Sequence, residues 1–427
     1  MTSPTLSLDS ARALDARDPL RGFRSKFGMP RDRLGEPLVY LGGHSLGLMP
    51  LAARAEMNQE LDDWERLGLL AHEGARRPWI PYHELLRPEV ARLFGCAEDE
   101  VVLMNSLTVN LHLMLASFYR PNGRRRSILI EAGAFPSDRY ALSTHLKWHG
   151  LEASEHLIEL APLEGEDLIH EESIERLLAE RAEEIALVLW PGVQYLTGQV
   201  FDLERIARAG RRAGAMVGFD LAHSVGNMPV ALGELGADFA AWCSYKYLNA
   251  GPGAIAGCFV SSQHFASPVR DRLAGWWGHE MTTRFDMPHD FNAAHGAPGF
   301  NISNQSVFAT APLIASLAIF REARMERVRE KSIALTGFLE RLLAERMPEV
   351  HSITPRTVEA RGAQLSLRLQ GGVTRGRAMF KWLNEHGVVC DWREPDIIRV
   401  APVPLYNSFE DAFLFVERLE QALRIED

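Results

Sequence analysis

The stretch Trp242-Cys243-Ser244-Tyr245-Lys246-Tyr247-Leu248-Asn249-Ala250-Gly251-Pro252-Gly253 places one lysine between two tyrosines, directly before a glycine-rich turn. Upstream, Gly218-Phe219-Asp220-Leu221-Ala222-His223 ends an apolar run with an acid and a histidine. Pyridoxal phosphate (PLP) needs a lysine that holds its aldehyde and a carboxylate that keeps its pyridine nitrogen protonated. Lys246 and Asp220, in this order and with these neighbours, therefore predict a PLP site.

Around this pair, short apolar runs alternate with amphipathic stretches from about residue 80 to 260. The runs that predict strands are 101–104, 127–130, 186–190 and 215–219, and the stretches that predict helices are 109–118, 134–149 and 203–214. This alternation is typical of a largely parallel sheet covered by helices on both faces, with ligands at the carboxyl ends of the strands. Thr108, Asp138, Asp220 and His223 follow such runs or lie near them.

The chain changes character after Gln305. A long helical stretch over 308–347 precedes an alternating strand near Leu365, a helix near 377–385, a strand over 388–392 and a last helix that starts at Ser408. These elements predict a smaller α+β domain. Residues 1 to about 35 are expected to form a loosely structured arm.

Composition limits the function classes. The 427 residues suffice for two domains, and 46 basic against 56 acidic side chains, in short scattered clusters, do not indicate nucleic-acid binding. Four widely spaced cysteines predict neither a disulfide framework nor a zinc site, and no histidine spacing predicts a catalytic metal. With no apolar N-terminal core and no window of about 18 apolar residues, a soluble cytoplasmic protein is expected.

A competing motif is Gly43-His44-Ser45-Leu46-Gly47, which matches the G-x-S-x-G nucleophile elbow of serine hydrolases. Such a fold needs several strands and an oxyanion loop before the nucleophile, whereas 44 residues precede Ser45. Labelling of Ser45 by a fluorophosphonate would favour this alternative.

From about Tyr40 to the C-terminus the chain resembles the kynureninases, PLP enzymes of the aspartate-aminotransferase fold (fold type I). The motifs that carry the resemblance are 43–48, 72–79, 105–111, 135–138, 275–280, 299–304 and 398–407. In the first of them His44 stands where the family has asparagine, and Pro191 stands where relatives often carry a polar side chain.

The resemblance implies an α/β fold with a mostly parallel seven-stranded sheet and a smaller α+β C-terminal domain. It divides the chain into an arm (1–35), an N-terminal segment that packs with the small domain (36–75), the large PLP-binding domain (76–305) and the small domain (306–427). It also implies a homodimer whose sites are composite, because segments 275–280 and 299–304 come from the neighbouring subunit in the family.

The resemblance assigns PLP as cofactor. Leu107 and Thr108 would bind its phosphate at a helix N-terminus, with Tyr195 and Tyr245 as further donors, and Phe135 would stack on its ring. The full set implied for the cofactor is Leu107, Thr108, Phe135, Ser137, Asp138, Tyr195, Asp220, His223, Tyr245, Lys246, Trp276 and Asn304.

The implied reaction is hydrolysis of L-kynurenine or 3-hydroxy-L-kynurenine to anthranilate or 3-hydroxyanthranilate and L-alanine, in tryptophan degradation or NAD precursor synthesis. Lys246, Asp220 and Tyr245 would be catalytic, and Ser45, His72, Asn304 and Arg399 would bind substrate. His72 and Asn304 predict a preference for the 3-hydroxy substrate. An alternative is a cysteine desulfurase-like PLP lyase, which requires an acceptor cysteine.

Overall fold

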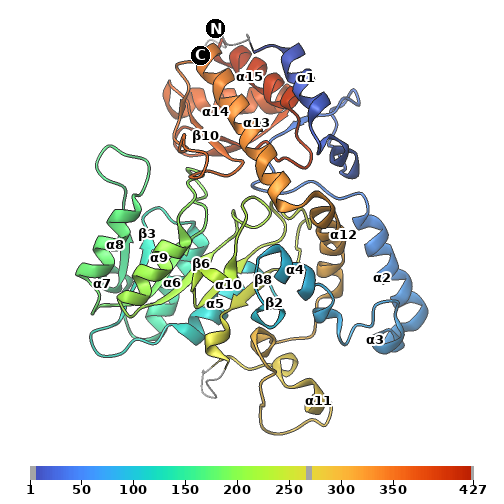
Figure 1. Cartoon of the computed structure of the whole chain (residues 1–427), viewed down its shortest axis with the longest axis vertical. Helices are drawn as coiled ribbons and strands as arrows, with labels where there is room; N and C mark the ends of the chain where they lie inside the picture. Colours follow the sequence, from blue (N-terminus) through green and yellow to red (C-terminus); the bar gives the residue numbers. More distant parts are fainter. Residues whose placement is uncertain (1–5, 266–271, 425–427) are drawn as a thin grey trace.

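The computed structural model describes residues 6–265 and 272–424, which form a larger part and a smaller part joined by long connections (Figure 1). Within these residues seven strands form the main sheet, in the order β2-β8-β7-β6-β5-β3-β4. Their bounds are β2 (Val101–Leu103), β3 (Ser127–Glu131), β4 (Leu157–Leu160), β5 (Ile185–Pro191), β6 (Met216–Asp220), β7 (Phe239–Trp242) and β8 (Gly257–Val260).

The main sheet is mostly parallel. Strands β7, β6, β5, β3 and β4 run in the same direction, and β8 is antiparallel to both β7 and β2. Successive side chains of a strand point to opposite faces, so an all-apolar strand must be covered on both. In β5, Leu187 and Leu189 belong to one core, whereas Val188 and Trp190 belong to the other. The predicted fold class is confirmed.

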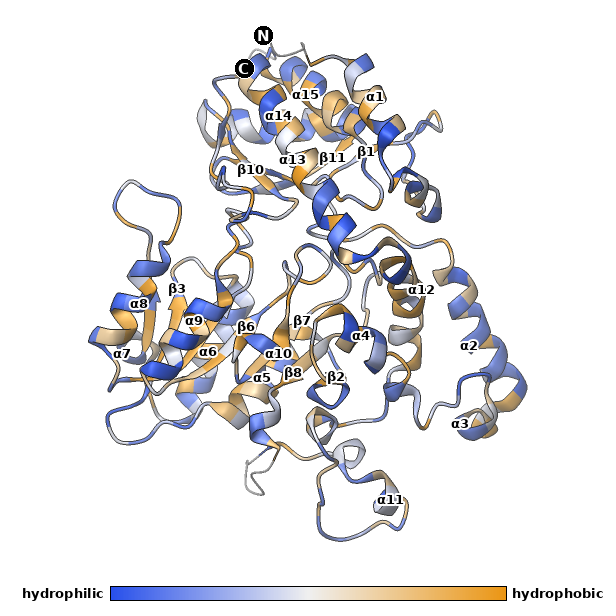
Figure 2. Cartoon of the chain, in the orientation of Figure 1, coloured by the Kyte–Doolittle hydropathy of each residue, from blue (hydrophilic) through white to orange (hydrophobic). Residues whose placement is uncertain are grey.

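Helices fill both layers around this sheet. One core contains buried residues of α5 (Leu107–Phe118) and α6 (Pro136–Trp148). The other contains residues of α4 (Arg87–Leu93), α8 (Glu171–Glu180), α9 (Leu203–Arg212) and α12 (Val307–Ala323). Figure 2 shows the same division, with hydrophobic residues concentrated on the strands and on α12. Short helices α7 (Ala153–His156) and α10 (Leu232–Leu235) also belong to this part.

The smaller part has its own core. Among the described residues its antiparallel sheet has the order β12-β13-β10-β9, and a separate parallel pair joins β1 to β11. The bounds are β1 (Val39–Tyr40), β9 (His351–Ser352), β10 (Leu365–Arg368), β11 (Val388–Val389), β12 (Asp391–Arg393) and β13 (Ile397–Val400). They pack with α1 (Leu8–Arg17), α13 (Met325–Arg346), α14 (Gly372–Glu385) and α15 (Phe409–Leu423).

Three local predictions need correction. The helical stretch 308–347 is two helices, α12 and α13, because Arg324 between them has a φ of 63°, in the left-handed region. The strand 388–392 is split into β11 and β12, which join different sheets. The arm is not loosely structured in its described portion, because α1 packs on α15.

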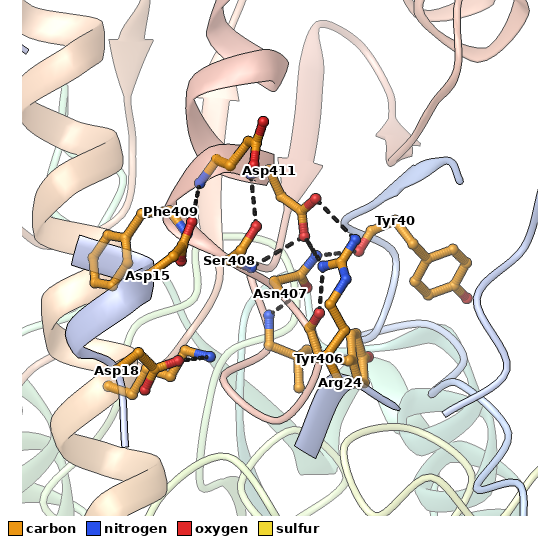
Figure 3. A network of polar contacts seen from close by, with 12 residues as sticks. Asp15, Asp18, Arg24, Tyr40, Tyr406, Asn407, Ser408, Phe409 and Asp411 are labelled. Atoms are coloured by element: carbon orange, nitrogen blue, oxygen red, sulfur yellow. Dashed lines mark hydrogen bonds and ion pairs between the residues drawn. The ribbon is translucent and has the colours of Figure 1, made fainter. Parts of the chain in front are cut away.

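The N-terminal arm is fixed to the start of α15 by side chains (Figure 3). Asp15 accepts hydrogen bonds from the backbone N–H groups of Phe409 and Glu410, at 2.8 and 3.0 Å. These two contacts satisfy donors that the first turn of a helix leaves unpaired. Arg24 adds an ion pair with the side chain of Asp411. Ser408, at which this helix was predicted to start, forms a capping box with Asp411.

The remaining helices lie at the edge of the larger part. Helix α2 (Ala53–Leu67) packs along α12 and leads to α3 (Ala71–Gly74), and α11 (Met281–Arg284) lies in a separate loop region (Figure 1). The predicted domain boundary near residue 305 stays a prediction: buried residues of α12 belong to the larger core, and those of α13 are divided between the two. No helix within residues 6–265 and 272–424 is long and apolar enough to span a membrane.

Candidate active site

A cavity of about 690 Å³, counting its open mouth, lies at the carboxyl ends of β3, β5 and β6. It brings together ten residues that the sequence predicts as cofactor ligands. They are Leu107, Thr108, Phe135, Ser137, Asp138, Tyr195, Asp220, His223, Tyr245 and Lys246. Ser106, Glu131, Pro191, Val193 and Ala222 complete the lining.

Lys246 lies in the turn that follows β7. The backbone N–H of Gly47 donates to the carbonyl of Tyr245 at 2.8 Å, and a Cβ atom at Gly47 would overlap the carbonyl of Lys246. The glycine therefore lets the 43–47 turn pack directly on the lysine turn. The Nζ atom of Lys246 lies 2.9 Å from Nε2 of His223. Burial, and then the charge of Lys246, hold the pKa of His223 well below its ordinary value, so the neutral ring accepts this hydrogen bond.

Three carboxyl groups, those of Glu131, Asp138 and Asp220, line the cavity that contains Lys246. Asp220 ends β6 and lies close to Asp138 of α6, and burial raises the pKa of both, that of Asp138 further through the charge of Asp220. Burial raises the pKa of Glu131 to about 8. Ionising all three at once is unfavourable, so the group retains protons near neutral pH.

The N-terminus of α5 opens into the same cavity. Leu107 and Thr108 occupy its first turn, and the side chain of the N-cap residue Ser106 makes no capping hydrogen bond within the described structure. The hydroxyls of Thr108 and Ser137 lie 2.7 Å apart. Unpaired N–H groups, the helix dipole and two hydroxyls together make an anion site suited to a phosphate.

Phe135 contributes a partly exposed aromatic ring to the lining of the cavity. Phe135 is 42% exposed, its ring meets that of Tyr195 edge to face at 5.3 Å, and Nζ of Lys246 lies 5.8 Å from its centroid. Its exposed face offers a surface on which a flat ring can stack.

These residues fit PLP. Lys246 can hold an aldehyde, the Asp138–Asp220 pair can face a protonated ring nitrogen, the start of α5 can bind phosphate, and Phe135 can cover the ring. The surplus of carboxyl groups is what a cationic pyridinium would neutralise. Within the described residues no group of three or more His, Cys, Asp or Glu side chains is arranged to hold a metal ion.

Arg399 and Ser45, both predicted to bind substrate, do not line this cavity. Arg399 lies on β13 and is 1% exposed. It donates through NH2 to Asp391 Oδ2 and through NH1 to the carbonyl of Tyr195, each at 2.6 Å. Asp391 is directly opposite Arg399 in the β12–β13 pair. Arg399 is thereby tied to Tyr195, which does line the cavity.

His72, Trp276 and Asn304 line a second cavity instead. Its lining is mostly apolar and consists of Leu69, Leu70, His72, Glu73, Ile80, Trp276, Trp277, Phe285 and Asn304. Leu69 is 81% exposed and Trp276 is 47% exposed. Figure 1 shows α3, which carries His72, at the edge of the molecule and well away from β6.

Ser45 lacks the setting of a nucleophile elbow. It lies exposed on a turn after β1, which pairs with β11 outside the main sheet, and the next helix, α2, begins only at Ala53. The neighbouring His44 forms no hydrogen bond with any residue that the structure describes. The serine-hydrolase alternative is therefore not supported by this geometry.

The cysteines do not open into the Lys246 cavity, although Sγ of Cys243 lies 4.0 Å from the carbonyl of Ala222 in its lining. Cys243, Cys258 and Cys390 are buried, and burial raises the pKa of the Cys96 thiol to about 12. None of them lines the Lys246 cavity as the described residues form it. An acceptor thiolate of the desulfurase type is thus absent from the lining.

A kynureninase from Xanthomonas campestris pv. campestris (strain B100) is 52% identical to this chain over 421 residues, which cover 98% of this chain and 99% of that protein. The chain belongs to the kynureninase family. A kynureninase from Myxococcus xanthus (strain DK1622) is 51% identical over 425 residues, with 98% and 99% of the two chains covered. The family described as "Kynureninase C-terminal domain" matches residues 328–419.

Solved structures place this kynureninase-family chain in a wider fold group. The cysteine desulfurase CsdA from Escherichia coli has a TM-score of 0.74 at 20% identity and covers 95% of this chain and 98% of its own. A C-DES mutant with glycine covalently linked to its PLP cofactor has a TM-score of 0.75 at 18% identity, with 90% and 96% covered. At these identities the likeness shows a common fold.

Proposed function

We propose that this chain is a PLP-dependent kynureninase that hydrolyses L-kynurenine to anthranilate and L-alanine. The observation that carries the proposal is the cavity in which Lys246, the Asp138–Asp220 pair and the start of α5 meet, in a chain that belongs to the kynureninase family. Bound PLP supplies an electron sink for the carbon atoms next to the substrate's amino group.

The side chains of the cavity then have distinct roles. Lys246 holds the cofactor and moves the proton of the substrate α-carbon, and neutral His223 keeps its amine in place. Burial raises the pKa of Tyr245 well above its ordinary value, so its hydroxyl remains protonated and acts as a donor to phosphate or to the substrate carbonyl. Asp220 would pair with the protonated ring nitrogen, and the N–H of Ala222 donates to its carboxylate at 2.7 Å and holds it in place.

Arg399 is proposed to bind the substrate α-carboxylate. A guanidinium matches a carboxylate in a two-bond, charge-assisted pair. Arg399 donates to the carbonyl of Tyr195, a residue that lines the Lys246 cavity, and this hydrogen bond holds the guanidinium next to the cavity. Ser45, on the exposed turn beside the lysine loop, is proposed to contact the same end of the substrate.

The second cavity supports a composite site. His72, Trp276 and Asn304 carry the motifs expected next to the substrate ring, yet they line a separate, apolar and exposed cavity of the same chain. A homodimer in which one copy's second cavity faces the partner's Lys246 cavity would bring the two sets together and cover the exposed side chains.

The substrate is further proposed to be 3-hydroxy-L-kynurenine in preference to L-kynurenine. His72 and Asn304 offer polar groups to a ring hydroxyl, and such groups are left unpaired when the hydroxyl is absent. The test is the ratio of kcat/KM for the two substrates, with a shift toward L-kynurenine expected in the double variant His72→Trp/Asn304→Thr. Equal preference in the native enzyme would reject this assignment.

The activity itself is tested with purified protein and added PLP. We expect fluorescent anthranilate and alanine to form in equal amounts from L-kynurenine, and no sulfide to form from L-cysteine. Sulfide release without anthranilate would instead favour a desulfurase. The four free thiols agree with a reducing cytoplasm, and tryptophan degradation or NAD precursor supply is the proposed context.

A further inference from the structure

His44 is a buried histidine without a hydrogen bond. It is 0% exposed, and neither ring nitrogen has a hydrogen-bond partner in the described part of the chain. Its position is fixed by the glycines on each side: a Cβ at Gly43 would overlap Tyr406, and one at Gly47 would overlap the Lys246 turn. A buried polar group in this state needs an explanation, since it costs free energy.

The charges around His44 explain its protonation state. The ionisable groups that face it come from the lysine turn, from the loop after β6 and from strands β12 and β13, namely Lys246, His223, Asp391, Arg393 and Arg399. Burial, followed by the charges of Arg399, Lys246 and Arg393, holds the pKa of His44 well below its ordinary value. His44 is therefore neutral in this state of the protein.

Asp391 places a carboxylate beside the ring of His44. Its Oδ2 lies 3.8 Å from Nε2, and the carbonyl of Leu41, also close to the ring, already accepts from the N–H of Ala401 at 2.8 Å. The neutral ring has one N–H, whereas the protonated ring has two. Protonation would thus give Nε2 an N–H for Asp391, whichever nitrogen carries the proton in the neutral ring.

The guanidinium of Arg399 is already hydrogen-bonded to a carboxylate of its own chain. Its NH2 group donates to Asp391 at 2.6 Å, and Arg393 donates to the same carboxylate oxygen at 3.1 Å. A carboxylate that binds Arg399 must compete with Asp391. It also brings a second negative charge close to His44 and offsets the cation that contributes most to keeping the ring neutral.

We propose that His44 takes up a proton when the substrate α-carboxylate binds Arg399, and that its imidazolium then holds the Asp391 carboxylate that the substrate displaces. The inference rests on the proposed function and adds a positioning residue to it. His44 acts through Asp391 and Arg399 and takes no part in bond cleavage. Because the proton is bound with the ligand, affinity for the carboxylate falls as pH rises through the pKa that His44 has in the complex.

The test is a count of protons taken up when the PLP-loaded enzyme binds L-alanine, the amino-acid product, which has the same α-carboxylate. Calorimetry at one pH in two buffers of different ionisation enthalpy gives this number. The variants are His44→Asn, which restores the family's residue, and Asp391→Asn, which removes the displaced carboxylate. His145→Asn is the matched control: His145 is also buried, neither ring nitrogen has a partner in the described residues, and burial lowers its pKa to about 4.

We expect the native enzyme and His145→Asn to take up about one proton more per bound L-alanine than His44→Asn and Asp391→Asn. A difference below about 0.2 proton between native enzyme and His44→Asn, with L-alanine bound by both, would overturn the inference and leave the proposed function intact. Failure of the native enzyme to bind L-alanine or to hydrolyse L-kynurenine would instead overturn both. If His44→Asn does not fold, Asp391→Asn decides alone by the same threshold.

Discussion

The two cavities of this chain differ in completeness. The Lys246 cavity is lined by polar groups that already contact one another, such as Lys246 with His223 and Thr108 with Ser137. The cavity of His72, Trp276 and Asn304 is lined mainly by apolar side chains and keeps several of them exposed. The first is organised to hold a cofactor within one chain. The second is a partly exposed apolar surface, as expected if it faces a partner in the proposed composite site.

The largest effect is expected from Lys246→Ala, which tests the first cavity. Without this amine the protein cannot hold PLP covalently or move the α-proton, so kcat should fall by at least about a thousandfold. The visible absorbance of the bound cofactor should be lost with it. Lys381→Ala, on the exposed face of α14, is the control. A borohydride-stable PLP adduct in Lys246→Ala would mean that another lysine holds the cofactor.

Mixed dimers test the relation between the cavities. Lys246→Ala and Asn304→Asp subunits, each inactive alone, should regain about a quarter of native activity when refolded together, because half the dimers are mixed and each has one intact site. Lys246→Ala mixed with Asp220→Ala is the control, since both residues line the same cavity and no intact site can form. Equal activity in the two mixtures, with mixed dimers present, would contradict a shared site.

Arg399→Leu tests whether this arginine binds the substrate α-carboxylate. Loss of a charge-assisted pair worth roughly 1.5–3 kcal/mol should raise KM at least about tenfold while PLP remains bound. Arg377→Leu is a suitable control, because Arg377 is an exposed arginine that pairs with Glu394. An unchanged KM in Arg399→Leu would remove this arginine from the substrate site.

Glu131→Gln tests, in the apoprotein, whether the Glu131 carboxyl of the Lys246 cavity has the raised pKa described above. The pKa of Glu131 is raised from 4.5 to about 8, so between these values the folded protein binds more protons than the unfolded chain and loses stability as pH rises. Glutamine stays neutral. The variant should have a Tm on the order of 1–3 °C higher than the native apoprotein at pH 8 and nearly the same Tm at pH 4.5. A pH-independent difference would show that the carboxyl does not titrate as described.

The smallest effect is expected far from both cavities. Asp15→Ala removes two hydrogen bonds from the start of α15 and should lower the free energy of unfolding by about 0.5–2 kcal/mol without changing KM. Asp62→Ala, an exposed acid of α2, should change it little. Denaturant titration measures both, and a changed KM in Asp15→Ala would show that the arm acts on the site.

The Lys246 cavity was predictable because its parts follow local patterns. Strand ends of a parallel sheet meet at one edge, so acids and hydroxyls placed after apolar runs come together there. Glu131 was missed although it gives the same signal as Asp220, since it also ends an apolar strand. An inventory of all acids at predicted strand ends would have found it.

The positions of Asp391 and of the unpartnered His44 depend instead on contacts between residues far apart in the sequence. Asp391 meets Arg399 through the register of β12 and β13, and His44 reaches both through the packing of a turn 347 residues earlier in the chain than Asp391. Neither spacing is visible in a local window. The separation of His72 and Asn304 from the Lys246 cavity depends on packing in the same way.

The contacts between the N-terminal arm and α15 also constrain the order in which the chain can fold while it is synthesised. Phe409, which binds Asp15, is synthesised 394 residues after it. Arg24 and its partner Asp411 are 387 residues apart. Helix α1 therefore cannot dock on α15 until the strands of the main sheet, which lie between them in the sequence, have been synthesised.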